Sequence, residues 1–94
     1  MFDPNPLNSA IEEFSEWQQP WTFFEVIHQS SILNEEQLAT WQRVWGLACQ
    51  AEYWQTADLS QCTKFATEAL QLAFPWLSML AIEQIIKAAS YEWQ

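Results

Sequence analysis

Glycine is almost absent from this sequence, since Gly46 is the only one among 94 residues. The chain therefore has no Gly-rich loop that could bind phosphate groups and no Gly-x-Ser-x-Gly turn that could present a nucleophile. Histidine is equally scarce, so a Ser–His–Asp triad would depend on His28 alone. The neighbouring acids Glu35 and Glu36 lie at an expected helix start, where they interact with the helix dipole. We therefore predict no catalytic residues and no enzymatic activity.

Basic residues are few: Arg43, Lys64 and Lys87 stand against twelve acidic residues, for a formal charge of −9. This charge repels phosphate, which disfavours binding to nucleic acid or to an anionic membrane surface. The acids occur singly or in pairs and do not form the regular track that mimicry of DNA phosphates needs. A strongly acidic chain instead favours a partner segment that is basic or apolar.

Cysteine is limited to Cys49 and Cys62, with no third or fourth metal ligand close to either in the sequence. A structural zinc site needs four donors in recognisable clusters, so we predict no metal site and no cofactor. Both cysteines fall on or beside apolar stripes, where the thiol acts as a small hydrophobic group. No secretory signal opens the chain, and the apolar stretch over residues 70–82 is too short to span a bilayer. We therefore expect a cytoplasmic protein with two reduced thiols.

Aromatic residues are abundant by contrast: seven Trp, six Phe and two Tyr make up 16% of the chain. This content excludes disorder for most of the sequence, and the length suits one domain with one core. Pro4 and Pro6 disfavour the α conformation in the residues that precede them. We therefore divide the chain into an extended N-terminal arm over residues 1–7 and a single helical-bundle domain over residues 8–94.

Hydrophobic residues recur with helical periodicity along this domain. Helices are expected from a cap at Asn8 or Ser9 to Pro20, over residues 21–29, from a cap at Asn34 to about residue 55, from Asp58 or Ser60 to about residue 73, and from Pro75 to residue 93. Residues 21–29 also have strand propensity, but no second strand exists to pair with them. Phe65 and Met79 are assigned to the buried faces of the last two helices. The predicted fold class is all-α, a compact bundle of four to five short antiparallel helices.

Seven tryptophans exceed what one small core encloses easily, because the indole is large and rarely fully buried. Trp17, Trp41 and Trp45 fall on apolar helix faces and are assigned to the core. The remaining tryptophans and the two tyrosines lie near the ends of the expected helices or on their secondary faces. Both residue types are enriched at interface hot spots, so we predict that they bind a partner. These candidate partner-binding residues are Trp21, Trp54, Trp76, Trp93, Tyr53 and Tyr91.

The function predicted from these features is a non-enzymatic protein–protein interaction module that acts as an adaptor, an assembly factor or chaperone, or a regulator. An aromatic surface with an acidic rim suits a partner's peptide tail or helix that carries basic or apolar side chains. The module would act as a monomer or as a homodimer. An alternative is a small helical protein that encloses an apolar ligand.

A second alternative follows from Glu25 and His28, which have the Glu-x-x-His spacing of di-iron carboxylate bundles. Such a site needs further inward-facing glutamates and normally a second Glu-x-x-His pair. Because His28 is the only histidine, a homodimer would be required to complete the site. We therefore rank this dimeric di-iron hypothesis below the two binding functions.

Overall fold

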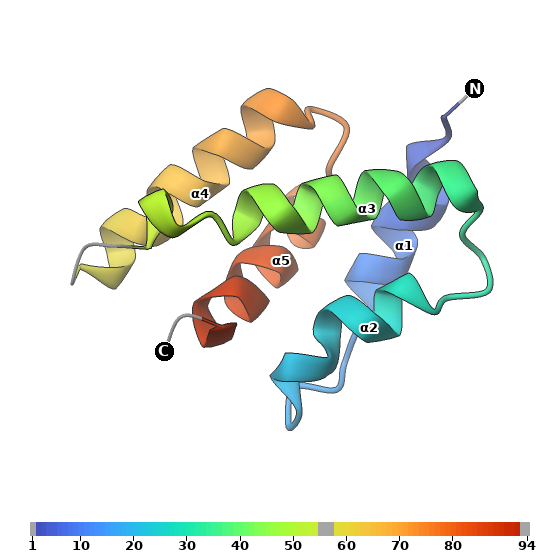
Figure 1. Cartoon of the computed structure of the whole chain (residues 1–94), viewed down its shortest axis with the longest axis horizontal. Helices are drawn as coiled ribbons and strands as arrows, with labels where there is room; N and C mark the ends of the chain where they lie inside the picture. Colours follow the sequence, from blue (N-terminus) through green and yellow to red (C-terminus); the bar gives the residue numbers. More distant parts are fainter. Residues whose placement is uncertain (1, 55–57, 93–94) are drawn as a thin grey trace.

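Helices are the only regular elements in the part of the chain that the computed structural model describes, residues 2–54 and 58–92. Figure 1 shows α3 lying across one side of the other helices, with α1 and α5 behind it. The predicted all-α bundle of short helices is confirmed. The elements are, in chain order, α1 (Pro4–Glu13), the 3₁₀ turn η1 (Pro20–Thr22), α2 (Phe23–His28), α3 (Glu35–Ala48), the 3₁₀ turn η2 (Ala51–Tyr53), α4 (Leu59–Ala73) and α5 (Met79–Glu92).

The first helix begins at Pro4, so the prediction of an extended arm over residues 1–7 was wrong. Asp3 caps this helix, and its carboxylate accepts a hydrogen bond from the Asn5 backbone N–H at 3.0 Å. A proline in the first turn costs no hydrogen bond, because the first four N–H groups of a helix have no partner within it. Leu7 is fully buried and fastens this turn to the core.

The chain turns away from α1 at Glu13, well before the expected helix end at Pro20. Phe14 has extended backbone at this point, and its side chain is buried in the core. Pro20 then begins η1, because its fixed φ angle suits the first position of a helical turn. α2 follows directly, which confirms the helical interpretation of residues 21–29 for Phe23–His28.

α3 starts where its sequence signal predicts. The Asn34 side chain accepts a hydrogen bond from the Gln37 N–H at 2.8 Å, and the Gln37 side chain accepts one from the Asn34 N–H at 2.9 Å. This reciprocal capping box satisfies two backbone groups at the helix start. The helix ends at Ala48, earlier than predicted, and η2 redirects the chain after it.

The last two helices also begin at capping side chains. Asp58 accepts a hydrogen bond from the Gln61 N–H at 3.3 Å at the start of α4. The Ser78 hydroxyl accepts one from a backbone N–H in the first turn of α5 at 3.0 Å. The sequence had led us to predict that the last helix begins at Pro75. In the structure α5 begins at Met79.

Phe65 and Met79 do not belong to the core, in contrast to their assignment from the sequence. Their side chains are 43% and 59% exposed. The apolar stripes of α4 and α5 are wider than the faces that contact neighbouring helices, so residues at the edges of the stripes face solvent. The inner face of α4 is filled instead by Cys62, Ala66 and Leu70.

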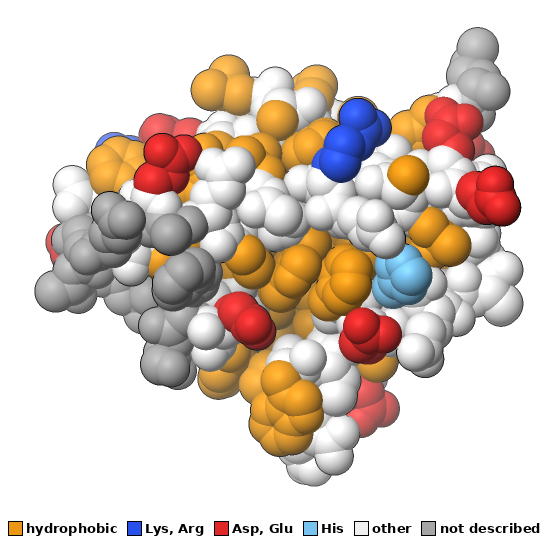
Figure 2. Space-filling model, in the orientation of Figure 1, with side chains coloured by type: hydrophobic (Ala, Val, Ile, Leu, Met, Phe, Trp, Pro, Cys, Tyr) orange, Lys and Arg blue, Asp and Glu red, His pale blue; other side chains and the backbone are white. Residues whose placement is uncertain are grey.

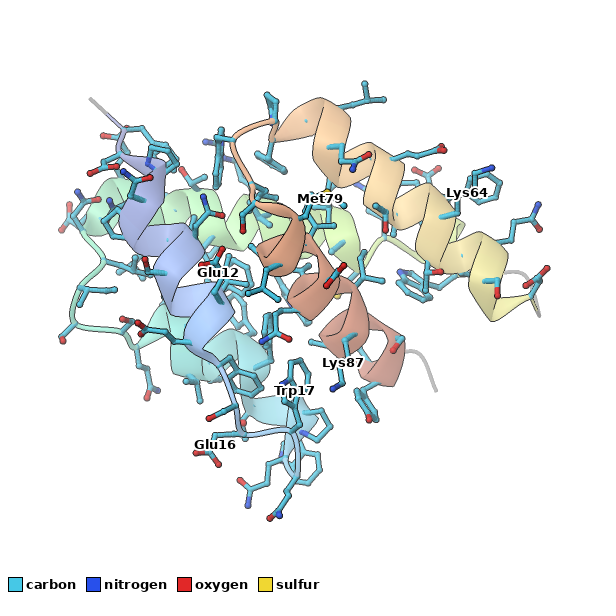
Figure 3. All side chains as sticks on the ribbon, turned by 180° about the vertical axis from the view of Figure 1, so that it is seen from behind. Glu12, Glu16, Trp17, Lys64, Met79 and Lys87 are labelled. Atoms are coloured by element: carbon cyan, nitrogen blue, oxygen red, sulfur yellow. The ribbon has the colours of Figure 1, made fainter. Side chains whose placement is uncertain are left out.

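α1 and α5 run side by side in the same direction, so the expected antiparallel arrangement does not hold for this pair (Figures 1 and 3). Asn8, expected to be a helix cap, lies within α1, and its side-chain oxygen accepts a hydrogen bond from the Ser78 N–H at 3.1 Å. One turn later Glu12 accepts a hydrogen bond from the Ser78 hydroxyl. Further along, the Gln84 amide donates to the Phe14 carbonyl oxygen at 3.0 Å. A short turn would force two consecutive helices to run in opposite directions. α1 and α5 can run in the same direction because most of the chain lies between them.

The core holds an aromatic group between α1, α2 and α3. Trp41 is fully buried, which confirms its assignment to the core. Trp17 and Trp45 are partly buried and pack against the same core. No helix in residues 2–54 and 58–92 combines the length and the apolar character needed to cross a membrane.

Candidate functional site

A cleft of about 340 Å³ opens between η1 and the C-terminal end of α5. It brings together two of the predicted partner-binding residues, Trp21 and Tyr91, which lie far apart in the sequence. We call it the aromatic cleft. The residues that line it are Trp17, Gln18, Pro20, Trp21, Tyr91 and Glu92.

The turn before η1 supplies one wall of the aromatic cleft, and local hydrogen bonds hold its shape. The Gln19 N–H donates to the Glu16 carbonyl oxygen at 2.9 Å. The Thr22 hydroxyl donates to the Gln19 carbonyl oxygen at 2.7 Å, across Pro20. Because proline also restricts the backbone here, Trp21 is presented from a turn with few alternative conformations.

Trp17 connects the aromatic cleft to the core. Its ring meets Phe14 edge to face at a centroid distance of 4.9 Å and stacks on Phe23 at 5.8 Å. The Lys87 ammonium lies over the same indole, 4.3 Å from the ring centroid, and Figure 3 shows these two side chains together below α5. A cation at this distance from an aromatic face is attracted by the ring quadrupole. Trp17 is therefore held rigidly by contacts within the chain.

Trp21 and Tyr91 are the exposed aromatics of the cleft. The Trp21 side chain is 70% exposed, and that of Tyr91 is 44% exposed. None of the described rings stacks on Trp21, whereas Trp41 in the core is fully buried among other rings. Large aromatic side chains that remain accessible in a concave site are typical of binding hot spots.

Acidic side chains lie in and near the aromatic cleft. Glu92 lines the cleft, and Glu16 lies in the turn that precedes Trp17 (Figure 3). No basic residue is among the lining residues, and the nearby Lys87 ammonium is held over Trp17. Figure 2 shows hydrophobic surface at the lower end of the molecule, around η1, with acidic side chains close to it. Glu92 is the one acidic residue among those that line the cleft.

Trp54, predicted from the sequence to bind a partner, lies in the core and does not line the aromatic cleft. Its side chain is 9% exposed, and its indole N–H donates to the Ala48 carbonyl oxygen at 2.8 Å. The 3₁₀ turn η2 folds the chain back, so that this indole covers the end of α3. Tyr53 is partly buried against the core and does not line the aromatic cleft.

Trp76 lies near the start of α5, away from the aromatic cleft. It is partly buried, with Phe2 edge to face at a centroid distance of 5.0 Å and Phe74 at 5.8 Å. Through these contacts the N-terminal end of α1 packs against the turn between α4 and α5. Trp93, the sixth predicted partner-binding residue, lies outside the described residues.

Several residues of the aromatic cleft were not predicted as site residues. Trp17 was assigned to the core, and it both packs against the core and lines the cleft. Pro20 does leave a sequence signal, because a proline next to an aromatic residue marks a turn that presents it. Glu92 and Gln18 leave no such signal, since their proximity depends on the packing of α5 against η1.

A second, smaller cleft of about 240 Å³ lies between α1 and α2. It is relevant to the alternative that the protein encloses an apolar ligand. Its volume falls below the roughly 300–1,000 Å³ that is usual for small-molecule sites. The residues that line it are Ala10, Glu13, Phe14, Val26, Ile27 and Ser30.

The Glu25–His28 pair is used in contacts within the chain. Glu25 accepts a hydrogen bond from the Gln29 amide at 3.4 Å. The His28 ring lies 5.4 Å from the Phe24 ring and 3.1 Å from the Gln42 amide nitrogen, measured from Nε2. Residues 2–54 and 58–92 contain no group of three or more His, Cys, Asp and Glu side chains placed to hold a metal ion.

Cys49 lies near the same end of α5. Burial of the thiol, together with the negative charge of Glu92, raises the pKa of Cys49 from 9.0 to about 12. The thiolate is the reactive form of cysteine, so this thiol is expected to react slowly in the folded protein.

The raised pKa of Cys49 predicts a loss of stability at alkaline pH. The unfolded chain releases this proton near pH 9.0, whereas the folded chain retains it up to about pH 12. The contribution of Cys49 is thus complete below pH 9.0 and is lost as the pH rises through that window. Urea denaturation at about pH 8 and about pH 10.5 should show a larger loss of stability for the wild type than for Cys49→Ala. Equal losses of stability in the wild type and in Cys49→Ala would show that the pKa of Cys49 is not raised by folding.

The chain matches no known protein-family model, and no curated protein or solved structure shows significant similarity to it. Its function is therefore inferred from the residues of the cleft and their chemistry.

Proposed function

We propose that this protein is a non-enzymatic interaction module that binds a short segment of a partner protein in the aromatic cleft. The observation that supports this most directly is the 70% exposure of Trp21 within a cleft that also holds Trp17 and Tyr91. An indole that stays in water contributes no burial free energy to folding, and the core of this chain already accommodates other large rings. Burial of Trp21 by a partner would recover that free energy.

The charge distribution supports a partner segment that is basic or apolar. The net charge is −9, Glu92 lines the cleft, and Glu16 lies in the segment that precedes Trp17. A negative rim accelerates association with a positive partner and disfavours acidic competitors. It equally disfavours the phosphate backbone of nucleic acids.

The geometry suits a short segment more than a broad protein surface. The cleft is local, and its walls are a restrained turn and the last turn of α5. Such sites typically hold one or two anchor side chains of a peptide tail or a helix. An adaptor, an assembly factor or chaperone, and a regulator all use this mode of binding, and we propose that the chain belongs to this functional class.

Selection from a random peptide library tests the proposal and requires no identified partner. The library is displayed on phage and selected against the immobilised protein, and affinities of the selected peptides are measured by fluorescence polarisation. We expect Trp21→Ala to weaken binding by about 30-fold or more, the loss typical of a hot-spot residue. Leu72→Ala serves as the matched control, because Leu72 is 85% exposed on α4 and does not line the cleft.

The control variant is expected to bind within about twofold of the wild type, since surface truncations remote from an interface contribute little. If no peptide is enriched, or if Trp21→Ala and Leu72→Ala bind equally well, the aromatic cleft is not a peptide-binding site. Thermal unfolding of each variant, followed by circular dichroism, verifies that both remain folded.

A further inference from the structure

We infer that the aromatic cleft recognises an arginine side chain of the partner segment, with the guanidinium seated on the Trp21 indole and directed to Glu92. This inference rests on the proposed function and names the anchor that the cleft selects. It follows from the aromatic faces, the carboxylate and the charge of this one site.

The lining residues combine the two groups that attract an organic cation. Trp21 and Tyr91 supply aromatic faces, and the negative face of an aromatic ring attracts a cation placed over it. Glu92 supplies a carboxylate in the same cleft. No lining residue is basic, and the Lys87 ammonium lies over Trp17, the cleft's other tryptophan.

The chain already contains a cation on the neighbouring ring. The Lys87 ammonium lies 4.3 Å from the centroid of the Trp17 indole, and Phe23 stacks on that same indole at 5.8 Å. Trp17 is thus engaged by a cation and by a ring from its own chain. Trp21 has no described ring stacked on it, so it is the tryptophan of the cleft that remains available to a cation from outside.

Arginine fits this cleft better than lysine does. The guanidinium is planar, stacks on an indole and carries five N–H donors in a fixed fork. It can therefore cover Trp21 while it donates hydrogen bonds to neighbouring acceptors, and Glu92 and Gln18 are among the residues that line the same cleft. An ammonium group is more strongly hydrated and does not stack. The cleft volume of about 340 Å³ leaves room for the guanidinium and its aliphatic stem.

Small-molecule probes test the anchor directly. N-acetylarginine amide and its neutral isostere N-acetylcitrulline amide are titrated into the ¹⁵N-labelled protein, and the indole N–H signal of Trp21 is followed by nuclear magnetic resonance. We expect the arginine probe to shift this signal and to bind about fivefold or more tightly than the citrulline probe, as a cation–π contact requires. N-acetyllysine amide is expected to lie between the two.

Two charge variants separate recognition in the cleft from general attraction to an acidic protein. Glu92→Gln should weaken the arginine probe roughly threefold and leave the citrulline probe unchanged. Glu68→Gln removes the same charge from the exposed surface of α4, outside the cleft, and should leave both probes unchanged. Both glutamates are exposed, so neither substitution is expected to unfold the chain.

The inference is overturned if citrulline binds as tightly as arginine, if neither probe shifts the Trp21 signal, or if Glu68→Gln weakens arginine as much as Glu92→Gln does. These failures are distinct from failure of the proposed function. A different result would be selected peptides that contain no arginine and still bind Trp21→Ala more weakly than they bind the wild type. That result would support the proposed function and refute the arginine anchor.

Discussion

Replacement of Trp41 by alanine is expected to lower the free energy of unfolding by about 3–5 kcal/mol, the range for truncation of a large buried aromatic. Trp41 is fully buried, and its ring lies 5.7 Å from Phe23, 5.8 Å from Phe24 and 5.9 Å from Trp45, measured between centroids. Its indole N–H also donates to the Phe24 carbonyl oxygen at 3.3 Å. The substitution removes contacts to three neighbouring rings at once and leaves a cavity among them.

Urea denaturation followed by far-ultraviolet circular dichroism measures this loss without relying on tryptophan fluorescence. A domain of this size has a total stability of roughly 5–15 kcal/mol, so Trp41→Ala is expected near the limit of folding. Trp41→Phe is the companion variant, because it keeps an aromatic ring and is expected to lose less than Trp41→Ala. A loss below about 1 kcal/mol for Trp41→Ala would show that this indole is not at the centre of the core.

Replacement of Trp54 by alanine is expected to cost about 3 kcal/mol, whereas Trp21→Ala costs less than about 0.5 kcal/mol. The two tryptophans had the same expected role from the sequence. Trp54 is 9% exposed and hydrogen-bonded to the Ala48 carbonyl oxygen, whereas Trp21 is 70% exposed. The loss at Trp54 combines removal of a buried ring with removal of that hydrogen bond.

The same denaturation experiment on both variants, together with peptide affinity, distinguishes a structural from a binding tryptophan. Trp54→Phe keeps the packing in part and removes only the N–H donor, so it should fall between the wild type and Trp54→Ala. Equal stabilities of Trp54→Ala and Trp21→Ala would mean that the indole of Trp54 does not cover the end of α3. Loss of peptide affinity is expected for Trp21→Ala at unchanged stability.

The aromatic cleft was only partly predictable from the sequence. Trp21 and Tyr91 were identified because large aromatic residues near helix ends often remain exposed. Their proximity was not predictable, since one lies in η1 and the other in the last turns of α5. The parallel packing of α1 and α5 brings these segments together, and a pattern of hydrophobic periodicity contains no information on which helices become neighbours.

The N-terminal helix illustrates a second limit of prediction from the sequence. Pro4 and Pro6 were interpreted as helix breakers, although a proline in the first turn is compatible with a helix. What decides between the two interpretations is whether the turn finds something to pack against. Leu7 is fully buried, and the Gln37 amide donates to the Asp3 carbonyl oxygen at 2.8 Å, so α3 holds this turn in place.

The sequence by itself determined the fold class, the acidic character and the helix start at Asn34, and it limited the start of α4 to Asp58 or Ser60. These features depend on interactions within a few residues, such as the hydrogen bonds of a capping side chain, and on the periodicity of apolar residues. Only the tertiary structure decided which tryptophans are buried. An indole is covered or exposed according to the distant segment that packs on it, which is why Trp54 is buried under the chain and Trp21 faces the cleft.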